Sequence, residues 1–158
     1  MESGQRPEHS LKRSRPTRGV NVSIGEPTIV FLTVCAKDRE PWIAQTAVQE
    51  SLENIWKAAD AWVVGYYLLM PDHLHLFCAP RDITFTFEQW LAYWKSQFSR
   101  SHRTEPWEWQ RAGFHHRMRS RSEYTEKWTY VRENPVRKGL VQNPDDWSFW
   151  GVIHELRW

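Results

Sequence analysis

The strongest constraint on the fold comes from two apolar runs, at 61–70 and 73–79, which only the dipeptide Pro71-Asp72 separates. Pro and Asp suit a tight turn, so the two runs are predicted to be consecutive strands. The first run, the longest apolar stretch of the chain, has about half of the ~20 residues that a membrane helix requires. The pattern therefore indicates a β-sheet in a protein without a membrane span.

Other periodicities surround this pair of strands. The β-branched and aromatic run at 28–35 predicts a buried strand, and a shorter strand is predicted at 114–119. Apolar residues from Val48 to Ala59 recur at helical spacing and predict an amphipathic helix. Further helices are predicted at 85–101 and at 123–134, the last one limited by the proline that follows it.

The predicted order of elements is β-α-β-β-α-β-α. Its first six elements match the split βαβ, ferredoxin-like arrangement, an α+β fold in which two helices cover one face of a four-stranded antiparallel sheet. The other face stays free for a site and for the C-terminal helix. A length of 158 residues suits one domain, predicted at 27–158. Residues 1–26 are rich in Arg, Ser, Pro and Gly and are predicted to be a flexible basic arm.

Charge is distributed unevenly, although the formal net charge is only +2. The segments 1–25 and 100–121 are basic, and the segment 26–99 between them is acidic. This segregation suits a polyanion along one side of the molecule, although an arginine cluster is also often a solvated face. Cys35 and Cys78 stand alone in apolar runs, which predicts small core residues in a reducing compartment. With no apolar segment behind the basic N-terminus, a cytoplasmic protein is expected.

His73 and His75 carry the most informative local pattern. Side chains two apart on a strand share a face, with Cβ atoms roughly 6–7 Å apart, so the two imidazoles can converge on one metal ion. Leu74 and Leu76 then point the other way and fill the core. The alternative is that the histidines are ordinary half-exposed strand residues. A metal site also needs a ligand from another segment, because the neighbouring Asp72 is expected on the opposite face as a turn residue.

The last predicted helix places Lys127, Tyr130 and Asn134 along one edge, beside its buried stripe. That stripe is predicted to consist of Tyr124, Trp128 and Val131. A phenol has a pKa near 10 and is a poor nucleophile unless a cation lowers that value, which Lys127 can do. A metal held by the histidine pair and the Asn134 carbonyl oxygen would orient a phosphodiester for in-line attack by Tyr130. The alternative is a rim aromatic followed by a cap before proline.

Together these segments resemble the REP-associated tyrosine transposases, a branch of the HUH single-strand transposases. The matching pieces lie between about Pro27 and Phe149. They are Met70-Pro-Asp-His-Leu-His-Leu-Phe77, Trp109-Gln110, His116 with the arginine-rich run after it, Tyr130-Val-Arg-Glu-Asn-Pro-Val-Arg-Lys-Gly-Leu-Val141 and Asp145-Asp-Trp147. The tyrosine segment is far more specific than the histidine pair.

The resemblance implies a metal-dependent endonuclease and strand transferase that acts on single-stranded, hairpin-forming repeat DNA. It implies Tyr130 as the nucleophile, His73, His75 and Asn134 as ligands of a divalent ion, Mg²⁺ or Mn²⁺, and a 5′-phosphotyrosine intermediate with a free 3′-OH. One departure is His115, since the family often carries an acidic residue there, which leaves any role for His115 or His116 open. A monomer or a homodimer is compatible with the resemblance.

Basic residues around these segments are predicted to contact DNA phosphates and to make binding salt-dependent. They are Arg117, Arg119, Arg121, Lys127, Arg132, Arg137 and Lys138. Trp107 and Trp109 are candidates for stacking on unpaired bases, with packing under a loop as the favoured alternative. Two other functions remain open from the sequence. One is a non-catalytic module that binds single-stranded nucleic acid on the same sheet, and the weaker one is a zinc hydrolase that uses the histidines.

Overall fold

The sheet of this protein is one strand wider than the sequence predicts. The computed structural model describes residues 27–158, and the arm predicted at 1–26 lies outside the described residues. Within residues 27–158, five antiparallel strands form one sheet in the order β4-β1-β3-β2-β5. They are β1 (Val30–Cys35), β2 (Trp62–Leu69), β3 (His73–Pro80), β4 (Phe114–Arg117) and β5 (Trp150–Val152). The first four have the predicted ferredoxin-like order. The prediction of four strands missed β5, which has three residues and so no measurable period.

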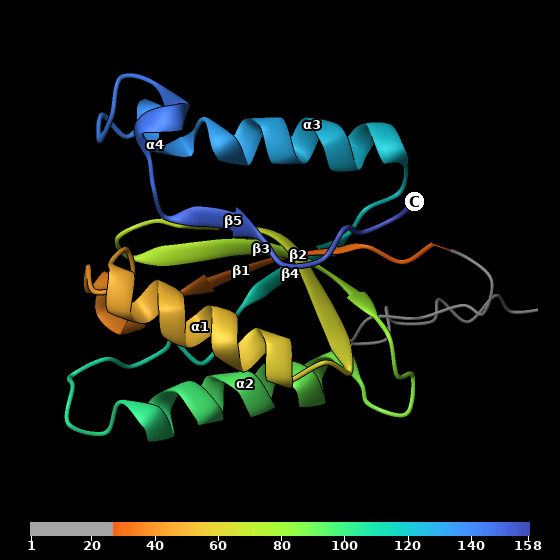
Figure 1. Ribbon diagram of the computed structural model, residues 1–158, viewed down its shortest axis with the longest axis horizontal. Helices are drawn as coiled ribbons and strands as arrows, with labels where there is room; N and C mark the ends of the chain where they lie inside the picture. The colour runs from red at the N-terminus through yellow and green to blue at the C-terminus, as the bar shows by residue number, and fades with distance from the viewer. Residues whose placement is uncertain (1–26) are drawn as a thin grey trace, which may run out of the picture.

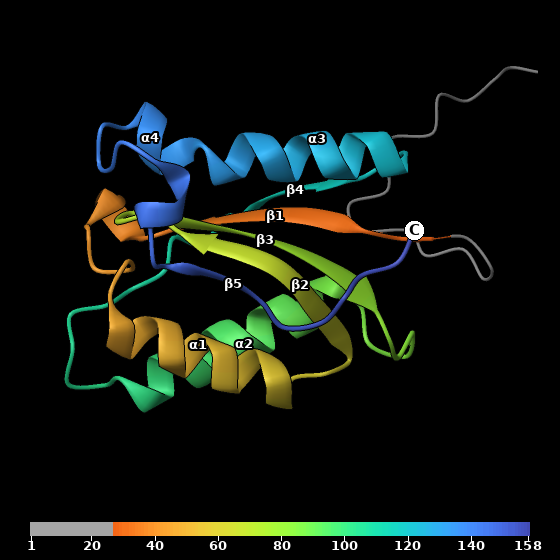
Figure 2. The same cartoon turned by 45° about the horizontal axis from the view of Figure 1, so that its top comes forward.

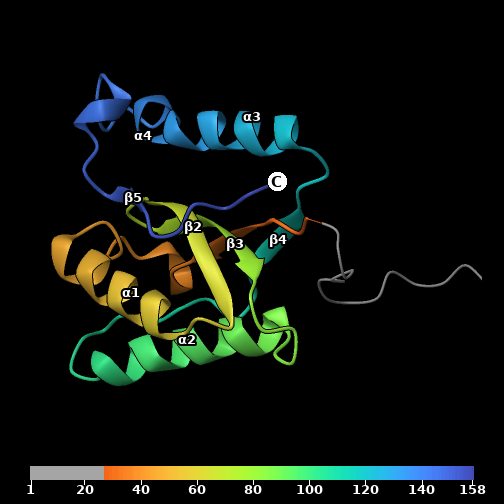
Figure 3. The same cartoon turned by 45° about the vertical axis from the view of Figure 1, so that its right-hand side comes forward.

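Helices lie on both faces of this sheet. They are α1 (Thr46–Ala58), α2 (Phe87–Ser101), α3 (Arg121–Arg132) and the short α4 (Asn134–Arg137), with 3-10 turns η1 (Lys37–Arg39) and η2 (Pro144–Asp146). Figures 1 and 3 both show α1 and α2 on one side of the sheet, and α3 with α4 on the other. The prediction of two helices on one face and a C-terminal helix apart from them is therefore confirmed.

The main core lies between the sheet and α1 with α2. Helical spacing buries Trp56 of α1 and Trp90, Trp94 and Phe98 of α2, as the sequence predicts. The helix α2 begins after Thr86, whose hydroxyl accepts a hydrogen bond from the Gln89 backbone N–H while the Gln89 side chain accepts one from Thr86. This capping box sets the start of α2 two residues later than expected.

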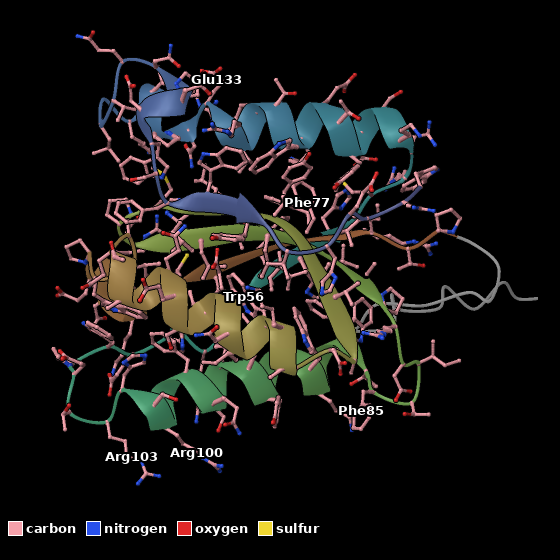
Figure 4. The ribbon with its side chains drawn as sticks, viewed as in Figure 1. Trp56, Phe77, Phe85, Arg100, Arg103 and Glu133 are labelled. Carbon is pink, nitrogen blue, oxygen red and sulfur yellow. The ribbon has the colours of Figure 1, made fainter. Side chains whose placement is uncertain are left out.

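A smaller cluster lies between the sheet and α3. Among the residues of α3, all of them described, Val131 alone is fully buried, while Tyr124 and Trp128 pack half-buried against Phe77. Figure 4 shows Phe77 on this side of the sheet. The predicted stripe of the helix is confirmed, but its predicted end at Asn134 is wrong. Pro135 has no N–H to continue the helical ladder, so α3 stops at Arg132 and the chain restarts as α4.

The strand β3 is thus the centre of the sheet, with β1 and β2 on either side. In Figures 1 and 2, the start of β3, the turn η1 and the helix α4 gather at one end of the molecule. No helix within residues 27–158 is long and apolar enough to cross a bilayer.

Candidate active site

The histidine pair opens onto the face of the sheet that α3 covers. On β3, Leu74 and Leu76 point into the main core, so alternation turns His73 and His75 the other way. His73 is 8% exposed, and the centroids of the two imidazole rings lie 4.8 Å apart. Two imidazoles at this separation can approach one ion. The structure therefore brings the predicted pair together on the predicted face.

Both imidazoles are held through the same nitrogen. His73 Nδ1 lies 2.8 Å from Asp72 Oδ1, and His75 Nδ1 lies 2.8 Å from the hydroxyl of Thr33 on β1. A carboxylate only accepts hydrogen bonds, so His73 Nδ1 carries the proton and its Nε2 keeps a lone pair. The Thr33 hydroxyl can accept from His75 in the same way. Metal-ligating histidines are usually oriented by such bonds, so this pair fits a metal ion through its Nε2 atoms.

Burial and positive charge keep the two rings neutral. Burial, the neighbouring His73 ring and then the cations of Lys127, Arg137 and Arg39 lower the pKa of His75 to about 3. Burial also lowers the pKa of His73, although Asp72 opposes the shift. Because only the neutral imidazole can bind a metal ion, both rings are in the competent state at neutral pH.

Asp72 is a site residue that sequence reasoning missed. It was expected on the opposite face as a turn residue, but it precedes the first residue of β3, where strand alternation does not yet apply. Arg39 Nε donates to Asp72 Oδ2 at 2.9 Å, and the pKa of Asp72 is lowered by its hydrogen bonds and charge interactions with His73 and Arg39, against the effect of burial. The signal in the sequence was its position directly before the first histidine.

The prediction that Cys35 is a small core residue is wrong. Cys35 pairs across the strands with His73, and its Sγ accepts a hydrogen bond from Arg39 Nη1 at 2.8 Å. It is half-buried on the site face, whereas Cys78 is a core residue as predicted. Arg39 reaches both groups from η1, where Asp38 and Arg39 have left-handed backbone angles with φ of 55°.

Asn134 lies against the histidine pair although it is 61 residues from His73 in sequence. Its Nδ2 donates to His73 Nε2 at 3.4 Å, and its Oδ1 accepts from Arg137 Nη2 at 3.4 Å. The first bond uses the lone pair that a metal ion would take, and half a turn of the amide would present Oδ1 in its place. Within residues 27–158, no group of three or more His, Cys, Asp or Glu side chains is arranged so that it could hold a metal ion. The Asn134 amide is thus the neighbouring group that fits as a third ligand.

Tyr130 is connected to this cluster through Arg137. The Arg137 guanidinium lies 3.8 Å from the centre of the Tyr130 ring, in addition to its bond to Asn134. The Tyr130 side chain is 61% exposed, so a large substrate can reach its hydroxyl. The predicted partner Lys127 instead places its ammonium 5.3 Å from the Phe31 ring, on the sheet side of α3.

The other predicted DNA contacts separate into two groups. Arg119 and Arg121 are exposed where α3 begins, and the guanidinium of Arg117 donates to the Pro27 carbonyl oxygen. Arg132 turns inward, because its guanidinium binds the Pro144 carbonyl at 2.7 Å and Asp145 at 3.2 Å and covers the Trp150 ring. Its side chain is 15% exposed, so Arg132 attaches α3 to the segment before β5 instead of facing solvent.

The structure also shows where the two histidines and the two tryptophans lie whose roles the sequence did not decide. His116 is on the α3 side and bonds Glu123 at 2.9 Å, whereas His115 is on the other face beside Phe87. Trp107 and Trp109 pack against the buried ring of Trp42 at the edge of the main core, as the favoured alternative predicted.

Comparisons with known proteins agree with this arrangement at the level of the fold. A solved REP-associated tyrosine transposase bound to a REP hairpin superposes with a TM-score of 0.68 and 20% sequence identity, over 83% of this chain and 80% of that one. The chain has the fold of a REP-associated tyrosine transposase. The structure of a candidate transposase from Deinococcus radiodurans R1 shares 13% identity at a TM-score of 0.49, over 72% of this chain and 97% of that one. No protein-family model and no curated protein matches the chain.

Proposed function

We propose that this protein is a transposase-type enzyme that nicks and rejoins single-stranded, hairpin-forming DNA with a divalent metal ion, Mg²⁺ or Mn²⁺. The observation that carries the proposal is the pair of neutral imidazoles whose Nδ1 atoms are held by Asp72 and Thr33, with the Asn134 amide beside them. The fold supports it, since the similar transposase was solved with a REP hairpin.

His73, His75 and Asn134 would hold the ion through two Nε2 atoms and one amide oxygen. When bound, the ion would polarise the scissile phosphodiester and neutralise charge that develops on its oxygens. All three groups are uncharged, so they leave the full positive charge of the ion available to the phosphate. Asp72 and Thr33 keep the two rings oriented for this task.

Tyr130 is the proposed nucleophile. Its Oη would form a bond to the scissile phosphorus, and the bond from that phosphorus to the 3′ oxygen would break. The phenol proton leaves to solvent and the departing 3′ oxygen takes one up, giving a 5′-phosphotyrosine and a free 3′-OH. Attack by a 3′-OH on the phosphotyrosine reverses these bonds and restores Tyr130, so rejoining needs no ATP. Arg137, whose guanidinium lies against the Tyr130 ring, would pair with the phosphate.

The proposed DNA surface follows α3. Arg119 and Arg121 lie at its start, and Arg137 and Lys138 lie past its end, beyond the roughly 18 Å that the 12 residues of α3 span. Lys127 is not part of this surface, because its ammonium lies on the sheet side of α3 over the Phe31 ring. Arg132 is left out of this surface, since its guanidinium is engaged inside the molecule. Binding should weaken steeply with salt, because each neutralised phosphate releases condensed counterions.

The decisive test is Tyr130→Phe with labelled single-stranded hairpin DNA and Mg²⁺ or Mn²⁺. The wild-type protein should form a covalent protein–DNA adduct that survives denaturing electrophoresis, and Tyr130→Phe should reduce its yield by at least about 10³-fold. Tyr93→Phe is the matched control, because Tyr93 is a similarly exposed tyrosine, at 54%, on the opposite side of the molecule. DNA binding without any adduct from the wild type would favour the non-catalytic binding module.

A further inference from the structure

A second basic region of the molecule is not used by the proposed chemistry. The six arginines of the basic segment 100–121 are divided by the fold. Arg117, Arg119 and Arg121 lie near the start of α3, and the other three lie in the last turn of α2 and in the segment between α2 and β4. Figure 4 shows Arg100 and Arg103 extending away from the body of the protein at the C-terminal end of α2. The surface around Arg103 therefore needs a separate explanation.

This surface is a groove of about 1120 Å³ between η1, the C-terminal end of α2 and the loop after it. Its basic side chains are those of Lys37, Arg39, Lys95, Arg103 and Arg111. Three carboxylates also line it, and one of them, Glu108, is paired with Lys37 at 3.0 Å. Arg103 and Arg111 are exposed and have no ion pair within the described part of the chain. The groove thus presents two guanidinium groups that form no ion pair, beside the two remaining carboxylates, those of Asp38 and Glu105.

An aromatic wall accompanies these charges. Trp107 lines the groove and stacks on Trp42, with 5.7 Å between ring centroids and 11° between ring planes. Trp107 also contacts the rings of Phe98 and His102 but is only half-buried, so part of the side chain is exposed in the groove. Basic side chains that follow a backbone, next to aromatic rings on which bases stack, are the combination that binds single-stranded nucleic acid without sequence preference.

One side chain links this groove to the histidine pair. Arg39 lines it and also donates to Asp72, the partner of His73. The segment that carries the aromatic wall continues to Gln110, whose backbone N–H donates to the Cys35 carbonyl at the end of β1. Cys35 is in turn the cross-strand neighbour of His73 on β3. Two strand spacings, about 10 Å, therefore separate this wall from the ligating histidine. Each nucleotide advances a strand by ~3.4 Å along the axis of a duplex and by more in an extended strand, so three nucleotides or fewer cover that distance.

From these observations we infer that the groove between η1 and α2 binds the unpaired strand that flanks the hairpin, with Arg103 and Arg111 on its phosphates and Trp107 against a base. The choice of DNA as the ligand rests on the proposed function. The groove would hold the strand that leads into or out of the cleavage position, while the surface along α3 holds the folded part of the DNA.

The test uses labelled oligothymidylate, which forms no hairpin, and protein with Tyr130→Phe, which forms no adduct. Fluorescence anisotropy against salt concentration should show that Arg103→Ala with Arg111→Ala weakens binding by about tenfold. It should also reduce the slope of log affinity against log salt by about 1.4, or ~0.7 for each lost phosphate contact. Arg100→Ala is the matched control, because Arg100 is exposed one turn earlier on α2 but does not line the groove. Equal binding by the double variant and the control would overturn the inference.

A second readout maps the contact directly. Bromodeoxyuridine-substituted oligonucleotide, photocrosslinked to the full chain, should attach at Trp107, and crosslinks confined to α3 would contradict the groove. These outcomes are independent of catalysis. A wild-type protein that forms no adduct but loses oligothymidylate binding in the double variant would refute the proposed function and leave the groove standing. Adduct formation by the wild type, with oligothymidylate binding unchanged in the double variant, would support the proposed function and refute the groove.

Discussion

The two faces of the sheet differ in how their covering helices are attached. The face under α1 and α2 is filled by fully buried aromatic side chains, among them Trp56, Trp62 and Trp94. The face under α3 is covered by half-buried rings such as Trp128, and polar bonds from Arg132 complete the attachment. One face therefore has a deep apolar core, and the other has an open, partly polar interface.

The face under α1 and α2 thus supplies most of the apolar packing, whereas the proposed site lies on the face under α3. The proposed nucleophile and metal site would have to remain accessible to DNA, which is consistent with the shallower burial of the helix that carries Tyr130. Regions with few buried apolar contacts open locally at a lower free energy than the global unfolding. We therefore expect α3 to detach from the sheet more easily than α1 and α2. Two of the predictions below test this contrast, and the one between them tests the proposed metal site on the open face.

The largest expected effect is on the free energy of unfolding, when Trp94 of α2 and Trp128 of α3 are each replaced by alanine. Trp94→Ala should lower the free energy of unfolding by about 3–5 kcal/mol, because it leaves a cavity in the main core. Trp128→Ala should lower it by about 1–2 kcal/mol, because that side chain is only half-buried. Urea denaturation followed by circular dichroism measures both values.

Trp94→Phe is the control for this pair. It keeps most of the ring and removes an indole N–H that has no hydrogen-bond partner within the described residues, so its effect should be smaller than that of Trp94→Ala. If Trp94→Ala and Trp128→Ala destabilised the protein equally, the two faces would not differ in the way described.

An intermediate effect is expected from the carboxylate that orients His73. Asp72→Ala should weaken binding of Mn²⁺ by about 10–100-fold, since losing the partner of a metal-ligating histidine typically has this consequence. Isothermal titration calorimetry measures the affinity without any turnover. Asp60→Ala is the matched control, because Asp60 also pairs with an arginine, Arg81, but lies outside the site. Equal Mn²⁺ affinity in the two variants would show that Asp72 does not contribute to metal binding.

The smallest effect compares the N-terminal caps of two helices. Thr86 caps α2 and Ser120 caps α3, each by accepting a backbone N–H hydrogen bond with its side chain. Alanine at either position should cost about 1 kcal/mol. Thr86→Ala should lower global stability by that amount, whereas Ser120→Ala should speed amide hydrogen exchange within α3 about fivefold and leave global stability unchanged. A loss of global stability in Ser120→Ala would show that α3 unfolds only with the rest of the chain.

The order of the elements could be predicted from the sequence because strand and helix periodicities are local. The apolar spacing along α2 and the alternation along β3 are set by the backbone geometry of each element, so they identified the split βαβ arrangement and the face of the histidine pair. The short strand β5 was missed because three residues carry no period. The proline after Asn134 correctly indicated that the helix ends nearby, but α3 stops at Arg132, two residues before the predicted end.

The surroundings of the site depended on contacts that join distant parts of the chain. The residues His73, Tyr130 and Asn134 were selected from the sequence, but the bonds to Thr33 on β1, from Arg39 on η1 and from Asn134 on α4 exist only after the sheet and its helices are assembled. The inward turn of Arg132 and the basic groove beside η1 arise in the same way. Local sequence dictates which face a side chain shares, whereas packing decides which distant partner it meets.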